Sequence, residues 1–180
     1  MTITATFSAR AAQPSDIQAH LPLLRALAAQ CDHITEFGVR KGNSTVAFLA
    51  GLADRGGGIL QSYDIAAPRI ETPELPLGVE WWFKQADTAL LREIDDTDLL
   101  FIDTLHTADQ VRAELRHAPC VRGRIVLHDT VLFAGQGERD SLGIAPAIFE
   151  FLADHDAQWR VAGHSSQSCG LLVLERRSPK

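Results

Sequence analysis

The order of strands and helices constrains this chain more than any other feature of its sequence. Short apolar runs, typical of buried strands, alternate with helical patterns over most of the length. These runs lie at residues 34–37, 59–65, 79–83, 99–102 and 124–127. Because parallel strands need long crossover connections, such alternation predicts a largely parallel sheet with helices on both faces.

The helical patterns lie between these strands and are apolar along one face. They are predicted at residues 14–28, 45–52, 88–94, 108–118 and 144–153. Pro22 interrupts the first pattern, so that helix either kinks at the proline or begins there. Each helix can therefore lay one side against the sheet.

The end of the chain breaks this alternation. Residues 159–162 and 170–175 have the pattern of two strands, and only a short polar loop joins them. That loop is too short for a parallel crossover, so the two strands should run antiparallel. The prediction is an α/β fold, a Rossmann-like three-layer sandwich with a mostly parallel sheet and a C-terminal antiparallel hairpin.

The length and the apolar content suit one domain. The chain has 180 residues, and 46% of them are hydrophobic, which is enough for a core without metals or disulfides. Residues 14–180 are expected to form this domain. Residues 1–13 are mostly small or polar, and they are expected to be loosely held.

Charge, apolar runs and cysteines exclude several classes of protein. The net charge of -6 argues against nucleic acid as a partner. No apolar stretch approaches the ~20 residues that span a bilayer, and there is no leader pattern, so a cytoplasmic location is expected. The three cysteines fit neither a disulfide framework nor a metal motif. A small molecule is the expected partner, and self-association is left open.

The first group of polar residues follows the first strand. It contains Glu36, Gly38, Gly42, Asn43 and Ser44, at the edge of a parallel sheet where ligands bind. Gly38 permits a tight turn, and the N-terminus of the helix that starts near Gly42 favours an anion. Glu36 suits a cationic amine. A ligand with an ammonium and a carboxylate would fit, and the alternative is an ordinary strand-to-helix turn with a surface acid.

Two further acids follow the second and third strands. Asp64 stands where an acid contacts ribose hydroxyls in nucleotide-binding folds, and its alternative role is a helix cap or a turn. Asp87 could face an adenine amino group, or it could cap the following helix.

The third group combines carboxylates with imidazoles. Asp103 and His106 follow one strand, and His128 and Asp129 follow the next, so all four can meet in one cleft. They could bind a divalent cation, and the histidines shift the choice from magnesium toward manganese, iron or zinc. Alternatively, His106 or His128 could act as a general base. In the structural alternative, Asp129 is a cap and His128 a hydrogen-bonded core residue.

These residues resemble a known family. The pattern Glu36-x-Gly38-x-x-x-Gly42-x-Ser44 resembles the first motif of class I S-adenosylmethionine-dependent methyltransferases, in the variant of catechol O-methyltransferase-like enzymes. Residues 99–106 and 124–130 resemble methyltransferase family 24, which is similar to macrolide-sugar O-methyltransferases and cephalosporin hydroxylases. The resemblance covers residues 34–175 and implies a seven-stranded sheet whose last strand is antiparallel.

The resemblance also implies a role for each site residue. The methionine part of the cofactor would be held by the first-motif residues, which are Glu36, Gly38, Gly42, Asn43 and Ser44. Asp64 would bind the ribose, Asp87 would lie near adenine, and Asp103 would lie beside the cofactor. In metal-dependent relatives, acids at the positions of Asp103 and Asp129 hold a divalent cation, and His128 stands where a further acid is common.

The predicted function is methyl transfer from S-adenosylmethionine to a hydroxyl of a small molecule, such as a sugar or a secondary metabolite. Asp103, His106 and His128 are the predicted catalytic residues, and Asp103, His128 and Asp129 the predicted ligands of a magnesium, manganese or other divalent cation. One alternative is a nicotinamide-dependent oxidoreductase, although Arg40 stands where such a loop needs a glycine. The other alternative is a non-catalytic binding protein on the same fold.

Overall fold

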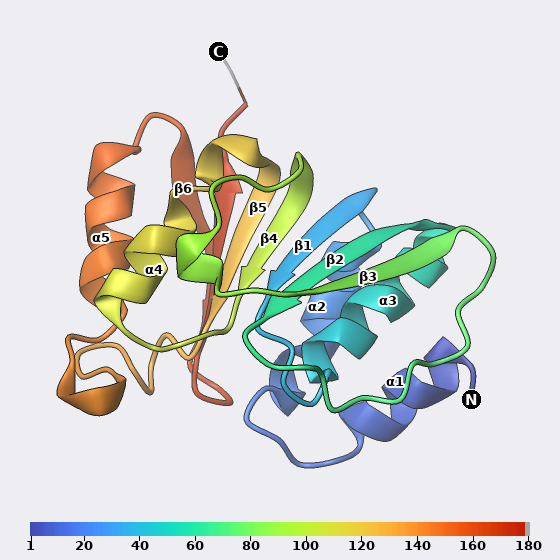
Figure 1. The fold of residues 1–180 in the computed structure, drawn as a ribbon. Helices are drawn as coiled ribbons and strands as arrows, with labels where there is room; N and C mark the ends of the chain where they lie inside the picture. Colours follow the sequence, from blue (N-terminus) through green and yellow to red (C-terminus); the bar gives the residue numbers. More distant parts are fainter. Residues whose placement is uncertain (179–180) are drawn as a thin grey trace.

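One sheet of seven strands runs through the computed structural model, which describes residues 1–178. The strand order is β3-β2-β1-β4-β5-β7-β6 (Figure 1). The strands are β1 (His33–Phe37), β2 (Gly58–Asp64), β3 (Val79–Gln85), β4 (Thr97–Ile102), β5 (Val121–His128), β6 (Trp159–Ser165) and β7 (Leu171–Arg176). The helices are α1 (Ile3–Ala11), α2 (Leu21–Ala28), α3 (Asn43–Arg55), α4 (Ala108–Leu115) and α5 (Ala145–Asp154).

The direction of the strands confirms the predicted fold class. Strands β1 to β5 run parallel to one another, whereas β7 runs antiparallel to both β5 and β6. The sequence therefore predicted the closing hairpin correctly, and the resemblance gave the correct number of strands. No helix among the described residues has both the length and the apolar character to cross a membrane.

The sheet separates two apolar cores. Helices α1, α2 and α3 cover one face, and α4 and α5 cover the other (Figure 1). Strand β4 supplies both cores because successive side chains of a strand point to opposite faces: Leu99 and Phe101 pack toward α3, and Leu100 and Ile102 pack toward α4. The sheet is therefore buried on both sides at its centre, as its apolar sequence requires.

The N-terminal residues differ from the expectation of a loose segment. Helix α1 occupies most of residues 1–13, and Thr2 caps it by accepting a hydrogen bond from the backbone of Ala5. Ile3 and Phe7 stand one turn apart and are buried in the core beside α3. Two large apolar side chains at helical spacing are thus enough to fix a segment that is otherwise small and polar.

Two predicted helices differ most at their ends. The first begins at Leu21, with Pro22 in its first turn, after the 3-10 helix η1 (Gln18–His20). The fourth stops at Leu115, and a second 3-10 turn, η3 (Ala118–Cys120), contains the proline that ends the helical pattern.

The helix predicted for residues 88–94 is the largest difference. Only the 3-10 turn η2 (Thr88–Leu90) forms, and the chain is extended again at Leu91. Leu90 is 77% exposed while Ile94 is buried, so this segment has no continuous apolar stripe to hold a helix on the sheet. As a result, no helix of the described chain covers β2 and β3 on the face of the sheet where α4 lies (Figure 1).

Gly51 sets how closely α2 and α3 approach, and its replacement by alanine should destabilise the protein. A Cβ there would lie 2.3 Å from the carbonyl oxygen of Arg25 and 2.5 Å from the Cβ of Ala28. We expect Gly51→Ala to lower the free energy of unfolding by about 1–3 kcal/mol in denaturant titration, although alanine is the better helix former.

The control is Gly135→Ala, because nothing lies within 4 Å of a Cβ at that position. Its free energy of unfolding should stay within about 0.5 kcal/mol of the original. A Gly51→Ala variant as stable as the original chain would contradict the close contact between the two helices.

Candidate functional site

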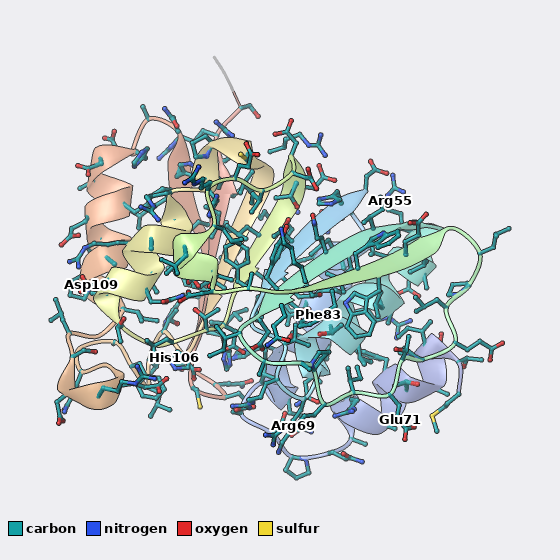
Figure 2. The ribbon with its side chains drawn as sticks, in the orientation of Figure 1. Arg55, Arg69, Glu71, Phe83, His106 and Asp109 are labelled. Atoms are coloured by element: carbon teal, nitrogen blue, oxygen red, sulfur yellow. The ribbon has the colours of Figure 1, made fainter. Side chains whose placement is uncertain are left out.

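Two adjoining cavities open at the carboxyl ends of the parallel strands. Their volumes are about 610 Å³ and about 210 Å³. The two cavities share five of their lining residues, Gly38, Arg40, Asp103, Thr104 and Glu138, so they form one cleft. The cleft lies at the edge of the sheet where His106 and Arg69 are labelled in Figure 2.

Two glycines shape the turn after β1. Gly38 has a φ of 90°, and a Cβ there would lie 1.9 Å from the carbonyl oxygen of Asp103. Gly42 caps α3 with a φ of 72°, and its Cβ would lie 2.5 Å from Ile70. Glycine is therefore required at both positions. Gly38 lines both cavities, whereas Gly42 packs against Ile70 and does not line either.

Glu36 lies beneath the cleft and does not line it. Its side chain is fully buried and accepts hydrogen bonds from Ser44 Oγ at 2.6 Å, Thr45 Oγ1 at 2.8 Å and Ser62 Oγ at 2.6 Å. Burial raises the pKa of Glu36 to about 7, against the lowering effect of the three hydroxyls. The sequence offered two roles for Glu36, an acceptor for a ligand amine or a surface acid, and the buried side chain fits neither. Its hydrogen bonds instead connect β1 to β2 and α3.

Asn43 and Ser44 line the smaller cavity at the N-terminus of α3. Asn43 Oδ1 accepts a hydrogen bond from the Arg10 guanidinium at 3.0 Å, and Ser44 Oγ is engaged by Glu36. Both side chains are therefore hydrogen-bonded within the protein. The first backbone N–H groups of α3 have no partner within the helix, so they are available to a ligand in this cavity.

Asp64 and Asp87 come together in the larger cavity, from the ends of β2 and β3. One oxygen of Asp64 accepts hydrogen bonds from the backbone N–H groups of Val39 and Arg40, at 2.8 and 3.0 Å. Asp87 caps η2 by accepting from the backbone of Ala89 at 3.0 Å. Each carboxylate has about four lone pairs, so both retain acceptor capacity for a ligand. The cap predicted for Asp87 is thus present, and it is compatible with a place in the cavity.

Asp103, His106, His128 and Asp129 converge as predicted. His106 Nε2 lies 2.6 Å from Asp129 Oδ2 and 3.5 Å from Asp103 Oδ1. His128 Nδ1 lies 3.4 Å from Asp103 Oδ1 and 3.3 Å from Asp129 Oδ2. Asp103 and His106 line the cleft, whereas His128 and Asp129 are buried behind them.

The charges in this acid–histidine cluster depend on one another. Burial by itself would lower the pKa of each histidine, but the close carboxylates of Asp103 and Asp129 raise the pKa of both His106 and His128 to about 10. Burial would raise the pKa of each carboxyl, yet the two histidines hold the pKa of Asp103 and of Asp129 below the usual value. At neutral pH the cation-free cluster therefore pairs two carboxylates with two imidazolium rings.

The same four side chains have the chemistry of a cation site. Ligand atoms of Asp103, His106 and Asp129 all lie within 4.8 Å of one another. Among the described residues, His106 Nε2 and His128 Nδ1 have no well-aligned hydrogen-bond partner although both are buried, because the carboxylates lie out of line with the ring N–H. Three of the four close distances are 3.3–3.5 Å, about the separation of two tetrahedral ligands at 2.1 Å from one ion.

Backbone and ring contacts hold the cluster in place. Asp129 has a φ of 59°, in the left-handed region that a non-glycine residue adopts only when its surroundings enforce it. His128 Nε2 lies 3.0 Å from the carbonyl oxygen of Ser168. The ring of His106 stacks on Phe133 at 4.4 Å between centroids.

Sequence analysis assigned no individual role to two residues that contact this cluster. Glu138 Oε1 lies 2.6 Å from His106 Nδ1, and Phe133 supplies the stacking ring. Both belong to the glycine-rich segment 133–143, which has no periodic pattern. The fold of that segment, and not its spacing, brings them to His106.

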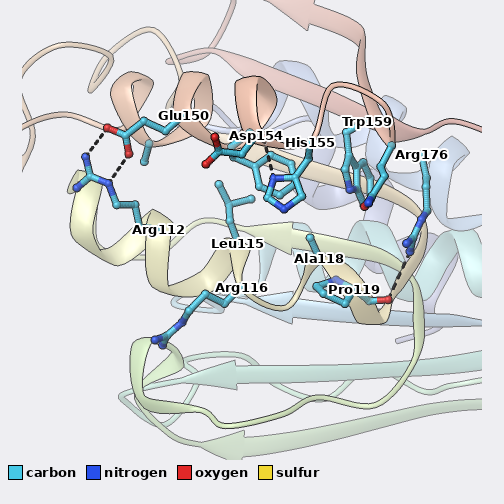
Figure 3. Close-up of a pocket in the computed structure, with 13 residues that line it drawn as sticks. Arg112, Leu115, Arg116, Ala118, Pro119, Glu150, Asp154, His155, Trp159 and Arg176 are labelled. Atoms are coloured by element: carbon cyan, nitrogen blue, oxygen red, sulfur yellow. Dashed lines mark hydrogen bonds and ion pairs between the residues drawn. The ribbon is translucent and has the colours of Figure 1, made fainter.

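A separate groove of about 650 Å³ lies between α4 and α5, at the opposite end of the sheet (Figure 3). Several of its charged groups are engaged within the protein. Arg112 forms an ion pair with Glu150 at 2.6 Å, and Arg176 donates to the carbonyl oxygen of Val121 at 2.6 Å. The groove is larger than either cavity of the cleft, but the clustered acids and histidines identify the cleft as the candidate site.

A family model places the cleft in a known context. The model of methyltransferase family 24, described as a methyltransferase domain, matches residues 35–130. This range contains every predicted site residue from Glu36 to Asp129. No curated protein has significant sequence similarity to the chain. The match favours the predicted methyltransferase over the nicotinamide-dependent alternative.

Several solved structures share the fold. The N-methyltransferase NodS of Bradyrhizobium japonicum, in complex with S-adenosylhomocysteine, has a TM-score of 0.59 at 12% identity and covers 100% of both chains. An O-methyltransferase of Bacillus cereus with the same ligand has a TM-score of 0.58 at 15% identity, over 97% of this chain and 89% of that one. The ligand-bound methyltransferase PaMTH1 of Podospora anserina has a TM-score of 0.56 at 15% identity, over 98% and 88%.

The raised pKa of Glu36 should make the stability of the protein depend on pH. Because its folded value of about 7 exceeds the ordinary value of 4.5, the folded chain retains a proton that the unfolded chain releases. This contribution is complete below about pH 4.5 and is lost as the pH rises through 7. The free energy of unfolding of the original chain should therefore fall between pH 5 and pH 8. In Glu36→Gln we expect this fall to be smaller by up to about 3 kcal/mol.

The measurement is denaturant unfolding at both pH values, with Glu71→Gln, at an exposed acid, as the control. An unchanged pH dependence in Glu36→Gln would show that folding does not raise the pKa of Glu36.

Proposed function

This chain belongs to the methyltransferase-domain family that its residues 35–130 match, and on that premise we propose that it transfers a methyl group from S-adenosylmethionine to a hydroxyl of a small molecule. The observation that carries this proposal is that the acid–histidine cluster opens into the same cleft as Asp64 and Asp87. The two acids suit a nucleoside, and the cluster suits a reacting hydroxyl. The larger cavity has the size of a small-molecule site.

The proposed cofactor contacts follow the lining of the cleft. Asp64 would accept hydrogen bonds from the ribose hydroxyls, and Asp87 would face the adenine. Gly38, Asn43 and Ser44 would bound the methionine part, where the N-terminus of α3 favours its carboxylate. Gly42 and Glu36 contribute by shaping and fastening this turn. S-adenosylhomocysteine bound to the structural neighbours NodS and the Bacillus cereus enzyme supports this proposal.

The proposed transfer needs alignment and the uptake of one proton. The bound cofactor would supply a methyl group that is already activated, so the protein must mainly position the acceptor oxygen. As the new carbon–oxygen bond forms and the carbon–sulfur bond breaks, the hydroxyl loses its proton. His106 already holds a proton in the cation-free cluster, so we assign this uptake to the carboxylate of Asp103, which lines the cleft beside it. Until that uptake, His106 and His128 balance the charge of the two acids.

A divalent cation at the acid–histidine cluster is the second part of the proposal. Asp103, His106, His128 and Asp129 would hold it, and a bound cation would lower the pKa of the acceptor hydroxyl. His106 was predicted as a base and not as a ligand, but its orphaned Nε2 faces the other three side chains. Two imidazoles and two carboxylates favour manganese, iron or zinc over magnesium.

Replacement of Asp64 should abolish tight cofactor binding. We expect titration calorimetry to show saturable binding of S-adenosylmethionine by the original chain. Asp64→Ala should weaken it by about 10- to 100-fold, because two hydrogen bonds to a carboxylate are lost. Asp96→Ala, at an exposed acid outside the cleft, is the control. The original chain should also transfer label from methyl-labelled cofactor to a pool of hydroxylated small molecules. Tight binding without any transfer would favour the non-catalytic alternative, and no binding would refute the cofactor proposal.

Replacement of Asp129 should remove the cation site while the cofactor site persists. We expect the original chain to bind manganese in solution, measured by electron paramagnetic resonance of the free ion. Asp129→Ala should weaken this binding at least tenfold, because one of four ligands is lost, and Asp96→Ala should leave it unchanged. If the original chain binds neither manganese nor zinc, the four side chains act only as a charge cluster.

A further inference from the structure

Strand β3 forms one edge of the sheet, and among residues 1–178 β2 is its only neighbouring strand (Figure 1). It is seven residues long, contains no proline, and keeps a continuous register with β2. Edge strands of this length are usually blocked by a bulge, a proline or a covering segment, because their unpaired backbone groups can pair with another chain. β3 has none of these internal blocks.

The hydrogen bonds to β2 identify which backbone groups face outward. Gly58 donates its N–H to the carbonyl of Gly78, and Ala86 donates to the carbonyl of Asp64. Because bonding residues alternate in a parallel strand, the even-numbered residues of β3 bond toward β2. The N–H and C=O groups of Trp81 and Phe83 therefore point to the open edge. Within residues 1–178, no hydrogen bond from a turn, loop or side chain reaches those groups.

Three side chains on one face of β3 form a row with opposite charges at its ends. Glu80, Trp82 and Lys84 alternate along the strand and are exposed, with Trp82 at 60%. The indole N–H of Trp82 donates to Glu80 at 3.1 Å, which confirms that both lie on the same face. This is the face on which no described helix lies above β2 and β3, and it leaves all three side chains exposed.

The charges of this row match those of a second copy of the strand that runs in the opposite direction. We propose that two copies of this chain associate through β3, antiparallel about a two-fold axis at Trp82. Glu80 then stands opposite Lys84 of the second copy, and Lys84 stands opposite the second Glu80. The two Trp82 rings meet at the axis, and on the other face Trp81 meets the second Phe83. The interface is thus isologous, with two opposite-charge pairs around an aromatic centre.

The backbone independently agrees with this register. Pairing about Trp82 sets Trp81 opposite the second Phe83, and both residues present outward-facing N–H and C=O groups. These two therefore form the hydrogen-bonded pairs of the new ladder. Glu80, Trp82 and Lys84 fall in the non-hydrogen-bonded positions, where opposing side chains are closest. Centring the axis on Trp81 or Phe83 would oppose a charged residue to Trp82 and lose both charge pairs.

Charge reversal tests the proposal, because each single change creates two like-charge pairs and the double change restores two opposite pairs. We expect sedimentation equilibrium to show a dimer for the original chain. Glu80→Lys and Lys84→Glu should each raise the dimer dissociation constant about tenfold or more. The double variant should return it to within about threefold of the original. Glu71→Lys, with the same charge change at an exposed acid outside the strand, should leave it unchanged.

Cysteine cross-linking tests the position of the axis. The Cα atoms of directly opposing residues in an antiparallel pair lie about 4.5–5.5 Å apart, a separation that a disulfide can bridge. Trp82→Cys should therefore form a disulfide-linked dimer on mild oxidation. Glu80→Cys is the matched control, because its two copies would stand about 14 Å apart along the strand and should not cross-link.

The outcomes separate clearly, and none depends on the proposed enzymatic activity. Restoration by the double variant, with cross-linking at position 82 and not at 80, supports the interface. A monomer at all concentrations, or a dimer that neither charge reversal weakens, overturns it. Circular dichroism of each variant shows that a lost dimer is not a lost fold. If Trp82→Cys does not fold, the charge-reversal series alone decides.

Discussion

The buried carboxylate of Glu36 is the contact on which the candidate site depends. Three hydroxyls, from Ser44, Thr45 and Ser62, converge on it from α3 and β2. They fix the first turn of α3 relative to the ends of β1 and β2, and this turn forms one wall of the cleft. Hydrogen bonds of a fully buried acid cannot be exchanged for water, so the turn keeps one conformation. The walls of the cleft are therefore built into the sheet before any ligand arrives.

The opposite wall is organised by charge. Asp103, His106, His128 and Asp129 come from the ends of two neighbouring strands, and the mutual shifts of their pKa values show that they behave as one group. A group of this kind can hold or release protons, or exchange them for a cation, without a change in backbone conformation. The combination of one wall held by hydroxyls and another built from paired charges suits a cofactor on one side and a reacting hydroxyl on the other.

The short connection between β3 and β4 has a consequence far from the cleft. Because only η2 forms there, one face of β2 and β3 has no helix over it, and Trp82 is exposed. The same connection places Asp87 in the larger cavity, where it caps η2. One local feature thus leaves Trp82 exposed on the edge strand and brings an acid into the larger cavity.

The sequence by itself determined most of the alternation of strands and helices, the closing hairpin and the residues at the strand ends, because these follow from local periodicity and chain length. Only the tertiary structure decided how those residues are used. Glu36 has the position of a ligand residue, but neighbouring segments bury it. Glu138 and Phe133 reach His106 through an aperiodic loop, and α1 forms because Ile3 and Phe7 find the core. Contacts between segments distant in sequence leave no local pattern, so the folded chain alone reveals them.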